Sequence, residues 1–514
     1  MGADRSLNRV RLMVSSVCMT VASAVAAPPQ PDVLVIYCDQ FRYDCYGAAG
    51  NPDVKTPHLD ALAAEGVRFT NSFCTWPVCT PSRYSLLSGM YVRQHGGFTN
   101  RATLHPTIDT YPRDLHRRGY DTMAIGKMHF TPPYLDVGFS RLLLSEQNGR
   151  GRLVDDYHRY LRDLGRVDAI DIIDQEREYR KDASADYWST FGAQVSDLPE
   201  ALHSTTWIGD RAVEAVGAWT DKPQLLMMGF IKPHHPFDPP DPWHKMYDPD
   251  KLTILPGWLD EPLAHDIALR RGYFDNRTLT EPALRRVMAY YYATISHMDA
   301  QIGRVIERLK ETRRYDNTLI VFTADHGEYL GFHHLLLKNN YMYDPLIKVP
   351  LIVKFPGGRL GGTASDALVN SVDVTTTIVE RTGGKPATTM MGQNLYPIAA
   401  GTRPGRKIIF AESSRAIMAR THTAKLLYHH DDAQSLFLDL KSDPLEMNNR
   451  YRDPAYVERI AELESAMARW SLFETRRPVH LDASEREIDQ PNVPADRGVL
   501  EKEMLRFIAD KLRR

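Results

Sequence analysis

Four short runs of apolar and β-branched residues each end beside titratable residues, and this repeated pattern limits the chain to few folds. The runs cover residues 32–37, 121–125, 225–230 and 318–322. Their length and composition predict buried strands. Helical patterns lie between them, among them residues 57–65 and 282–314. Strands alternating with helices predict an α/β fold, here a large mixed, mostly parallel sheet sandwiched by helices.

Chemically active side chains follow each predicted strand. They are Asp39 and Gln40, then Lys127 and His129, then His234, and finally Asp325 and His326. Ligands of open α/β sheets collect beyond the carboxyl ends of the strands, so we expect one common site there. Two carboxylates at that edge would repel each other unless a cation lay between them. For each aspartate taken alone, a helix cap or turn role is the alternative.

Residues 79–83 read Cys-Thr-Pro-Ser-Arg and run into a segment that stops at Gly89. We expect a helix, with Thr80 as its cap and Pro81 in the first helical position. The N–H groups and the dipole at this end favour an anion beside Cys79. Arg83, about one turn further on, would add a positive charge. The alternative for an isolated cysteine is a small buried structural thiol.

This segment resembles the maturation signature of type I (formylglycine-dependent) sulfatases, in the alkaline phosphatase superfamily, and the resemblance extends over residues 32–450. It implies that a maturase oxidises Cys79 to Cα-formylglycine, whose hydrate is the nucleophile, and that one Ca2+ is bound. The implied metal ligands are Asp39, Gln40, Cys79, Asp325 and His326. Gln40 departs from the second aspartate of many sulfatases, although its amide oxygen can still ligate.

Two later segments resemble further family signatures. In residues 119–129, the resemblance implies that Lys127 holds the hydrate and the sulfate and that His129 takes a proton. These two residues would face the same side of an extended segment. In residues 232–237 it implies that His234 protonates the leaving alcohol. His235 is the rival, since neighbours on an extended chain face opposite ways.

Lys338 matches the lysine that follows the Asp-His-Gly motif in the family. The resemblance implies that Arg83, Lys127, Lys338 and the metal spread the charge of the sulfuryl oxygens. Asp325 would hold the proton of the nucleophile. Weaker candidates for the pocket wall are Asn100, His333 and His334.

The expected reaction is hydrolysis of a sulfate ester. The inserted segments 140–199 and 238–280 are rich in arginine and aromatic residues, which suit a sulfated saccharide. One rival function is that of a phosphonate or phosphodiester monoester hydrolase, whose members share the Asp-Gln and Asp-His pairs but generally lack Lys127 and His129. Two further candidates are a non-catalytic exported glycan-binding protein and a cytosolic enzyme that uses the unmodified thiol.

Residues 1–27 predict a Sec-type signal peptide, because three arginines precede an apolar stretch that ends in Ala-Val-Ala. We therefore expect an exported protein, periplasmic or secreted, without stable membrane insertion. The formal net charge of −2 argues against a broad positively charged surface for binding nucleic acid. Among Cys38, Cys45 and Cys74 one disulfide can form, and the sequence does not decide whether it does.

The chain divides, by composition, into a catalytic domain over residues 28–395, a C-terminal subdomain over 396–475 and a tail over 476–514. A segment rich in glycine and proline, residues 392–405, reads as a linker. Short runs after it predict a small antiparallel sheet with one helix, and residues 443–449 resemble the family's closing turn and the start of that helix. A last helix is expected over residues 500–512.

Overall fold

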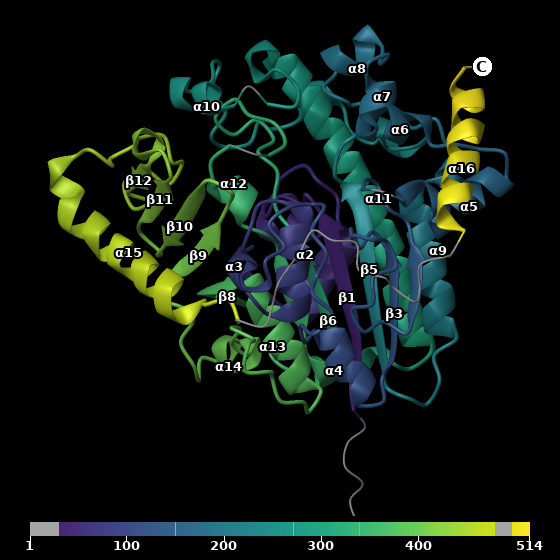
Figure 1. The fold of residues 1–514 in the computed structure, drawn as a ribbon, viewed down its shortest axis with the longest axis horizontal. Coiled ribbons are helices and arrows are strands. Elements are labelled where there is room, and N and C mark those ends of the chain that lie inside the picture. Colours follow the sequence, from purple (N-terminus) through teal and green to yellow (C-terminus); the bar gives the residue numbers. More distant parts are fainter. Residues whose placement is uncertain (1–29, 150, 271, 339, 479–495, 514) are drawn as a thin grey trace, which may run out of the picture.

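An eight-stranded mixed sheet forms the centre of the molecule (Figure 1). The computed structural model describes residues 30–149, 151–270, 272–338, 340–478 and 496–513, so the predicted signal peptide lies outside the described residues. The strand order is β4-β3-β5-β1-β6-β7-β2-β8. The strands are β1 (Asp32–Asp39), β2 (Val67–Phe73), β3 (Asp121–Gly126), β4 (Arg141–Leu144), β5 (Gln224–Pro233), β6 (Thr318–Ala324), β7 (Leu351–Lys354) and β8 (Thr363–Asn370).

All neighbours in this sheet are parallel except β7, which runs antiparallel to β6 and β2. β1 is buried on both faces: Leu34 and Ile36 pack in one hydrophobic cluster, whereas Val33 and Val35 pack in the other. This explains why the strand reads as a continuous apolar run without alternation. The predicted α/β sandwich is confirmed.

Helices cover both faces of the sheet. One face carries α1 (Pro57–Glu65), α9 (Ser204–Gly217) and α11 (Glu281–Glu311), and the other carries α2 (Cys79–Ser88), α4 (Tyr111–Arg117) and α13 (Ser371–Arg381). The inserted segments form short helices at the edge of the molecule. These are α5 (Asp156–Asp163), α6 (Ala169–Gln175), α7 (Arg177–Arg180), α8 (Ala185–Ser189) and α10 (Ala264–Leu269).

A second sheet packs beside the first, with the antiparallel order β12-β11-β10-β9. Its strands are β9 (Ile409–Glu412), β10 (Ala416–Arg420), β11 (Lys425–His429) and β12 (Leu436–Leu438). One helix, α15 (Val457–Arg469), covers it through Ile460 and Leu463. The predicted small antiparallel sheet with one helix is therefore present.

The structure corrects one local prediction and adds a detail to another. Residues 443–449 form only a turn, in which the Asp443 carboxylate accepts bonds from the N–H groups of Met447 and Asn448, and the helix begins later, at Val457. The predicted linker contains a short helix, α14 (Leu395–Ala399), because Leu395 and Ile398 are buried against the large domain. The last helix, α16 (Arg497–Leu512), is slightly longer than expected.

The four cysteines among the described residues, Cys38, Cys45, Cys74 and Cys79, are all buried and free. None of the helices that the structure describes combines the length and apolar character that a membrane crossing requires.

A buried ion cluster joins a short helix, α12 (Asp344–Ile347), to the second sheet. Asp344, at the start of α12, pairs with Arg420 of β10 at 2.8 Å and with Lys425 of β11 at 2.5 Å. We expect Asp344→Asn to lower the free energy of unfolding by about 3 kcal/mol, because it leaves a buried guanidinium unpaired. Urea denaturation measures this loss. Asp432→Asn is the control, since its pair with Arg452 is exposed and should leave the midpoint unchanged.

Candidate active site

The four predicted strand ends meet at one edge of the sheet. β3, β5, β1 and β6 are adjacent and parallel, so the residues that follow them share one side. Asp39 ends β1, while Lys127, His234 and Asp325 come directly after β3, β5 and β6. Asp39, Asp325 and Lys127 are buried, as is expected of a site closed by the sheet below and loops above.

Cys79 faces this edge from the first residue of α2. Thr80 does not cap this helix, contrary to the prediction, because the helix begins two residues earlier than expected, at Cys79 after Val78. The Thr80 hydroxyl instead donates to the carbonyl of His129 at 2.9 Å. The Thr80 N–H is capped from another segment, by the side-chain oxygen of Asn100 at 3.1 Å.

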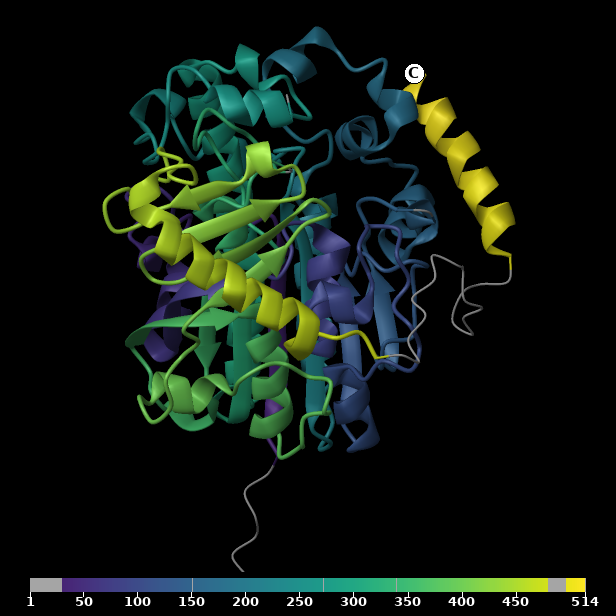
Figure 2. The ribbon, with the colours of Figure 1, turned by 60° about the vertical axis from the view of Figure 1, so that its left-hand side comes forward.

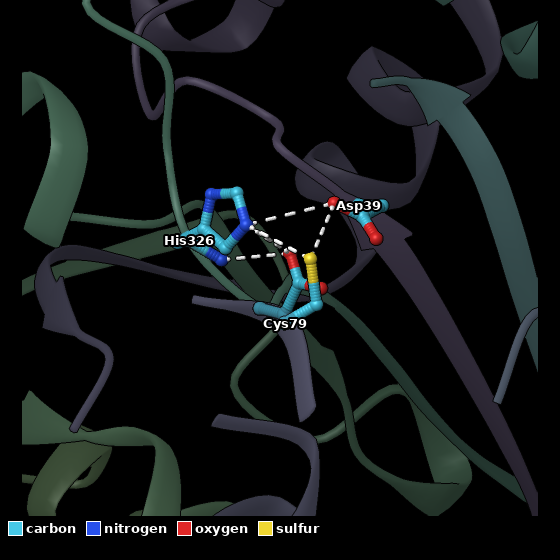
Figure 3. A group of neighbouring side chains, drawn as sticks. Asp39, Cys79 and His326 are labelled. Atoms are coloured by element: carbon cyan, nitrogen blue, oxygen red, sulfur yellow. Dashed lines mark hydrogen bonds and ion pairs between the residues drawn. The ribbon is translucent and has the colours of Figure 1, made fainter. Parts of the chain in front are cut away.

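Three side chains surround the Cys79 thiol. In a formylglycine at this position, the aldehyde or hydrate oxygens would take the place of the sulfur. Sγ lies 3.5 Å from Asp39 Oδ1, 3.4 Å from His326 Nε2 and 3.4 Å from Lys338 Nζ. Figure 3 shows the first two side chains converging on the sulfur. Burial and the Asp39 carboxylate raise the pKa of the thiol to about 12. An unmodified Cys79 would therefore be a poor nucleophile at neutral pH.

The side chains around the Cys79 sulfur carry more positive than negative charge. Arg83 Nε bonds to Asp325 at 2.9 Å, and Lys127 Nζ lies 2.7 Å from Asp39. Burial opposes ionisation of Asp39, but the charges of Lys127 and Arg83 hold the pKa of this carboxyl well below its usual range. With Lys338, three cations face two carboxylates, which favours an anionic ligand.

The donor set fits a hard cation. Ligand atoms of Asp39, Cys79, Asp325 and His326 lie within 4.8 Å of one another. Gln40 adds an amide oxygen, Oε1, that is buried and has no hydrogen-bond partner. Its Nε2 donates to Glu328 at 2.5 Å, which fixes the orientation of the amide. Oxygen donors from carboxylates and amides are what Ca2+ prefers, so the residues present suit such an ion.

His326 is held in the tautomer that a metal ligand needs. Its Nδ1 donates to the carbonyl of Gly327 at 2.9 Å, so Nε2 carries a lone pair toward Cys79. Burial, with a contribution from the Lys338 charge, lowers the pKa of His326 to about 4. The ring is thus neutral.

His129 reaches the site differently from the prediction. β3 ends at Gly126, and His129 has a φ of 57°, so this segment is not extended. The Glu146 carboxylate holds the turn by accepting from the N–H groups of Met128 and His129 at 3.0 and 2.9 Å. Both ring nitrogens of His129 are buried without a partner. Strained backbone of this kind costs about 1–3 kcal/mol and clusters at functional sites.

His234, rather than its neighbour, points at the cluster. Its Nε2 lies 3.1 Å from Lys338 Nζ, while His235 Nδ1 pairs with Asp174 at 2.7 Å. The extended-chain argument predicted that the two rings face opposite ways. This prediction was wrong, because the rings stack with their centroids 4.3 Å apart. Lys338 Nζ also lies 3.1 Å from His326 Nε2, so this partly exposed lysine bridges two of the histidines.

Two weaker candidates lie elsewhere. The ring nitrogens of His333 and His334 bond to the carbonyls of Leu445 and Leu259, away from Cys79.

Two residues that the sequence did not single out do belong to the site. Gln147 accepts from Lys127 Nζ at 3.2 Å, and Glu146 positions His129. Glu328 could have been found from the sequence, because it directly follows the Asp-His-Gly motif, but the sequence analysis assigned it no function.

Comparison with known proteins identifies the family of this chain. The sulfatase family model matches residues 31–384, and the model of the N-sulphoglucosamine sulphohydrolase C-terminal region matches residues 331–472. An arylsulfatase of Clostridium perfringens is 29% identical over 85% of this chain and 94% of its own length. A choline-sulfatase of Rhizobium meliloti is 30% identical, with 83% of each chain covered.

Two further relatives bear on the substrate. An N-acetylglucosamine-6-O-sulfatase of Bacteroides thetaiotaomicron is 26% identical over 84% of this chain and 85% of its own. The crystal structure of a phosphonate monoester hydrolase of Agrobacterium radiobacter superposes with a TM-score of 0.72 at 25% identity, covering 85% of this chain and 94% of that one. The chain belongs to the sulfatase family of the alkaline phosphatase superfamily and is a sulfuric ester hydrolase.

Proposed function

We propose that this enzyme hydrolyses sulfate esters of saccharides, with Cys79 converted to formylglycine and one Ca2+ bound beside it. The observation that carries the proposal is the placement of Cys79 Sγ within 3.5 Å of Asp39, His326 and Lys338 at the carboxyl edge of the sheet. The carbohydrate sulfatase among the relatives supports a saccharide substrate. Formylglycine would supply a hydrated aldehyde, with two hydroxyl groups on one carbon.

Asp39, Gln40, Asp325 and His326 would hold the ion together with residue 79. When bound, Ca2+ supplies a Lewis acid that lowers the pKa of a hydroxyl group and offsets charge on the sulfuryl group. Arg83 keeps Asp325 oriented through its 2.9 Å bond, and Lys127 does the same for Asp39 at 2.7 Å.

Proton transfer would fall to two histidines. His234 Nδ1 bonds to a backbone carbonyl at 2.6 Å, so its Nε2 is the atom that can gain a proton and give it to the leaving alcohol. The negative charge of a bound sulfate ester favours this protonated form. Burial, with the Lys127 charge, lowers the pKa of His129 well below its usual value, so the ring is neutral, and its unpartnered nitrogens leave a lone pair that can accept a proton.

Calcium binding gives a first test. Adding Ca2+ to chelator-treated protein should raise the thermal midpoint, because a ligand at 100 times its dissociation constant stabilises the folded state by about 2.7 kcal/mol. Asp325→Asn should remove most of this shift. Asp366→Asn changes a carboxylate on the edge strand β8 and should keep the full shift. Equal shifts in all three proteins would contradict the assigned ligands.

Hydrolysis of phosphonate monoesters is a second candidate activity, because the structure resembles that of a phosphonate monoester hydrolase. Lys127 and His129 both lie at the site, and they are the residues expected to favour sulfate. We therefore expect kcat/KM for 4-nitrophenyl sulfate to exceed that for phenyl phosphonate esters and for bis(4-nitrophenyl) phosphate. A preference for either phosphorus ester would reassign the substrate.

We propose export as well, on the pattern of residues 1–27, and maturation by a formylglycine-generating enzyme. N-terminal sequencing of protein secreted from the native host tests the first point, with cleavage expected near Ala26 or Ala27. Membership of a family of hydrolases and the full set of titratable side chains argue against a non-catalytic glycan-binding role.

A further inference from the structure

A cleft of about 770 Å3 opens beside His129, outside the catalytic cluster. This volume lies within the range of about 300–1,000 Å3 that is usual for small-molecule sites. Its walls come from four segments far apart in sequence and from the C-terminal helix. They include residues near Asn100, Thr131, Asn148, Arg152 and Gln175, and one side of α16.

Three residues that line this cleft carry buried polar atoms without hydrogen-bond partners. Besides both ring nitrogens of His129, they are Asn148 Oδ1 and Arg152 Nη2. The Arg152 side chain is only 1% exposed, and its other nitrogens bond to Asp171 at 2.7 Å and to Glu176 at 2.8 Å. Leaving a buried polar group unpaired costs about 1–3 kcal/mol, so one unpaired donor and one unpaired acceptor in the same cleft point to a missing ligand.

A hydrogen-bonded chain ties Arg152 to the catalytic cluster. Lys127 Nζ bonds to Gln147 Oε1 at 3.2 Å, and Gln147 Nε2 bonds to Asp171 at 3.0 Å. Asp171 in turn holds Arg152. A group bound by Arg152 would therefore lie at a fixed place relative to Lys127, as the alcohol portion of a sulfate ester must.

The C-terminal helix α16 forms the outer wall of the cleft. Met504 and Ile508 anchor it in a small hydrophobic cluster with Leu153 of η2 (Arg152–Val154). Figures 1 and 2 show α16 standing beside these inserted segments, at the edge of the molecule remote from α15. Its residues Arg497, Glu501 and Leu505 line the cleft. The Arg497 guanidinium lies against Gly151, where φ is 85° and a side chain would clash.

Charge in the cleft is balanced. Among the residues that the structure describes, Arg101, Arg152 and Arg497 line it together with Glu176 and Glu501, and Asp171 pairs with Arg152, so three positive groups meet three negative ones. A polyanionic ligand gains little from such a surface. Hydroxyl groups both donate and accept, and so match one unpaired donor beside one unpaired acceptor.

We propose that this cleft binds the sugar ring of a monosulfated saccharide, and that Arg152, Asn148 and α16 determine which saccharide is accepted. Arg152 Nη2 donates to a sugar oxygen, Asn148 Oδ1 accepts from a hydroxyl group, and Arg497 closes the outer side. This inference rests on the proposed function. It adds the recognition groups and assigns the C-terminal helix to the substrate site.

The test compares two substrate types. A panel of monosulfated mono- and disaccharides is first screened with the wild-type enzyme, and the best substrate is compared with 4-nitrophenyl sulfate, which has no sugar hydroxyl groups. We expect Asn148→Ala to lower kcat/KM for the saccharide sulfate by about 10- to 100-fold, the scale of one lost substrate hydrogen bond. Turnover of 4-nitrophenyl sulfate should change by less than about 3-fold.

Two arginines of α16 provide the matched pair. Arg497→Ala should lower kcat/KM for the saccharide sulfate by about 10-fold, whereas Arg506→Ala, an exposed residue on the opposite side of the helix, should not. Equal losses on both substrates, or no loss on the saccharide, would overturn the inference. So would turnover of 4-nitrophenyl sulfate with no active saccharide in the panel, although sulfate ester hydrolysis would then stand. A fully matured enzyme inactive on every sulfate would overturn the proposed function itself.

Discussion

Replacing Cys79 by alanine should abolish sulfate ester hydrolysis. The thiol is buried between Asp39, His326 and Lys338, and no other candidate nucleophile lies in this cluster among the described residues. We expect kcat for 4-nitrophenyl sulfate to fall by at least about 10^4-fold, since loss of a nucleophile leaves only binding and electrostatic stabilisation. The release of 4-nitrophenolate measures this directly.

The matched control is Cys74→Ala. Cys74 is also a buried, free cysteine, but its N–H bonds to the carbonyl of Ile347, and its thiol has no hydrogen bond to the described residues of the catalytic cluster. This variant should retain turnover within about 3-fold of wild type. Comparable losses in both variants would indicate damaged folding instead of a missing nucleophile.

Removing His234 should have an effect that depends on the leaving group. A saccharide alcohol needs a proton as it departs, and general acid catalysis contributes about 10^2–10^4-fold to such a step. We therefore expect His234→Ala to lower kcat/KM for a saccharide sulfate by that factor. The loss for 4-nitrophenyl sulfate should be less than about 10-fold, because nitrophenolate departs without a proton. Steady-state kinetics on both substrates give the ratio.

His235→Asn is the control for this ratio. His235 stacks on His234 and pairs with Asp174, but its ring is not in contact with Lys338. Its variant should keep the two substrates in their wild-type proportion. If His234→Ala lowered both activities equally, His234 would act by positioning Lys338 instead of by giving a proton.

The sequence predicted four of the eight strands of the central sheet, β1, β3, β5 and β6, because each of these carries its own signal. The runs that became β1 and β6 are buried on both faces, so they read as unbroken apolar segments. Their parallel order then brings Asp39 and Asp325 to one edge, which is a property of the topology. The side chains at strand ends could therefore be grouped from the sequence alone.

Errors arose where a distant segment decides the local geometry. Thr80 looked like a cap, but Asn100 supplies that hydrogen bond from another loop. His333 and His334 are close in sequence to Lys338, yet positive φ values of 52° and 64° turn this segment toward other carbonyl groups. Such bonds between distant segments leave no local pattern.

The proposed substrate cleft was the least predictable part. Asn148 and Arg152 belong to an inserted segment that the sequence linked to a saccharide only through its arginine and aromatic content, and their neighbour Gln147 bonds to Lys127. The sequence after residue 475 predicted a helix, but it did not indicate which part of the molecule that helix contacts. Its position over the cleft depends on the anchoring of Met504 and Ile508 against Leu153.

The most direct test of the central claim is the mass of the peptide that carries position 79. Protein coexpressed with a formylglycine-generating maturase should yield this peptide about 18 Da lighter than the cysteine form, because CH2–SH has become CHO. The same preparation should hydrolyse 4-nitrophenyl sulfate in proportion to the converted fraction. An unmodified thiol despite an active maturase, or full conversion without turnover of any sulfate ester, would contradict the account.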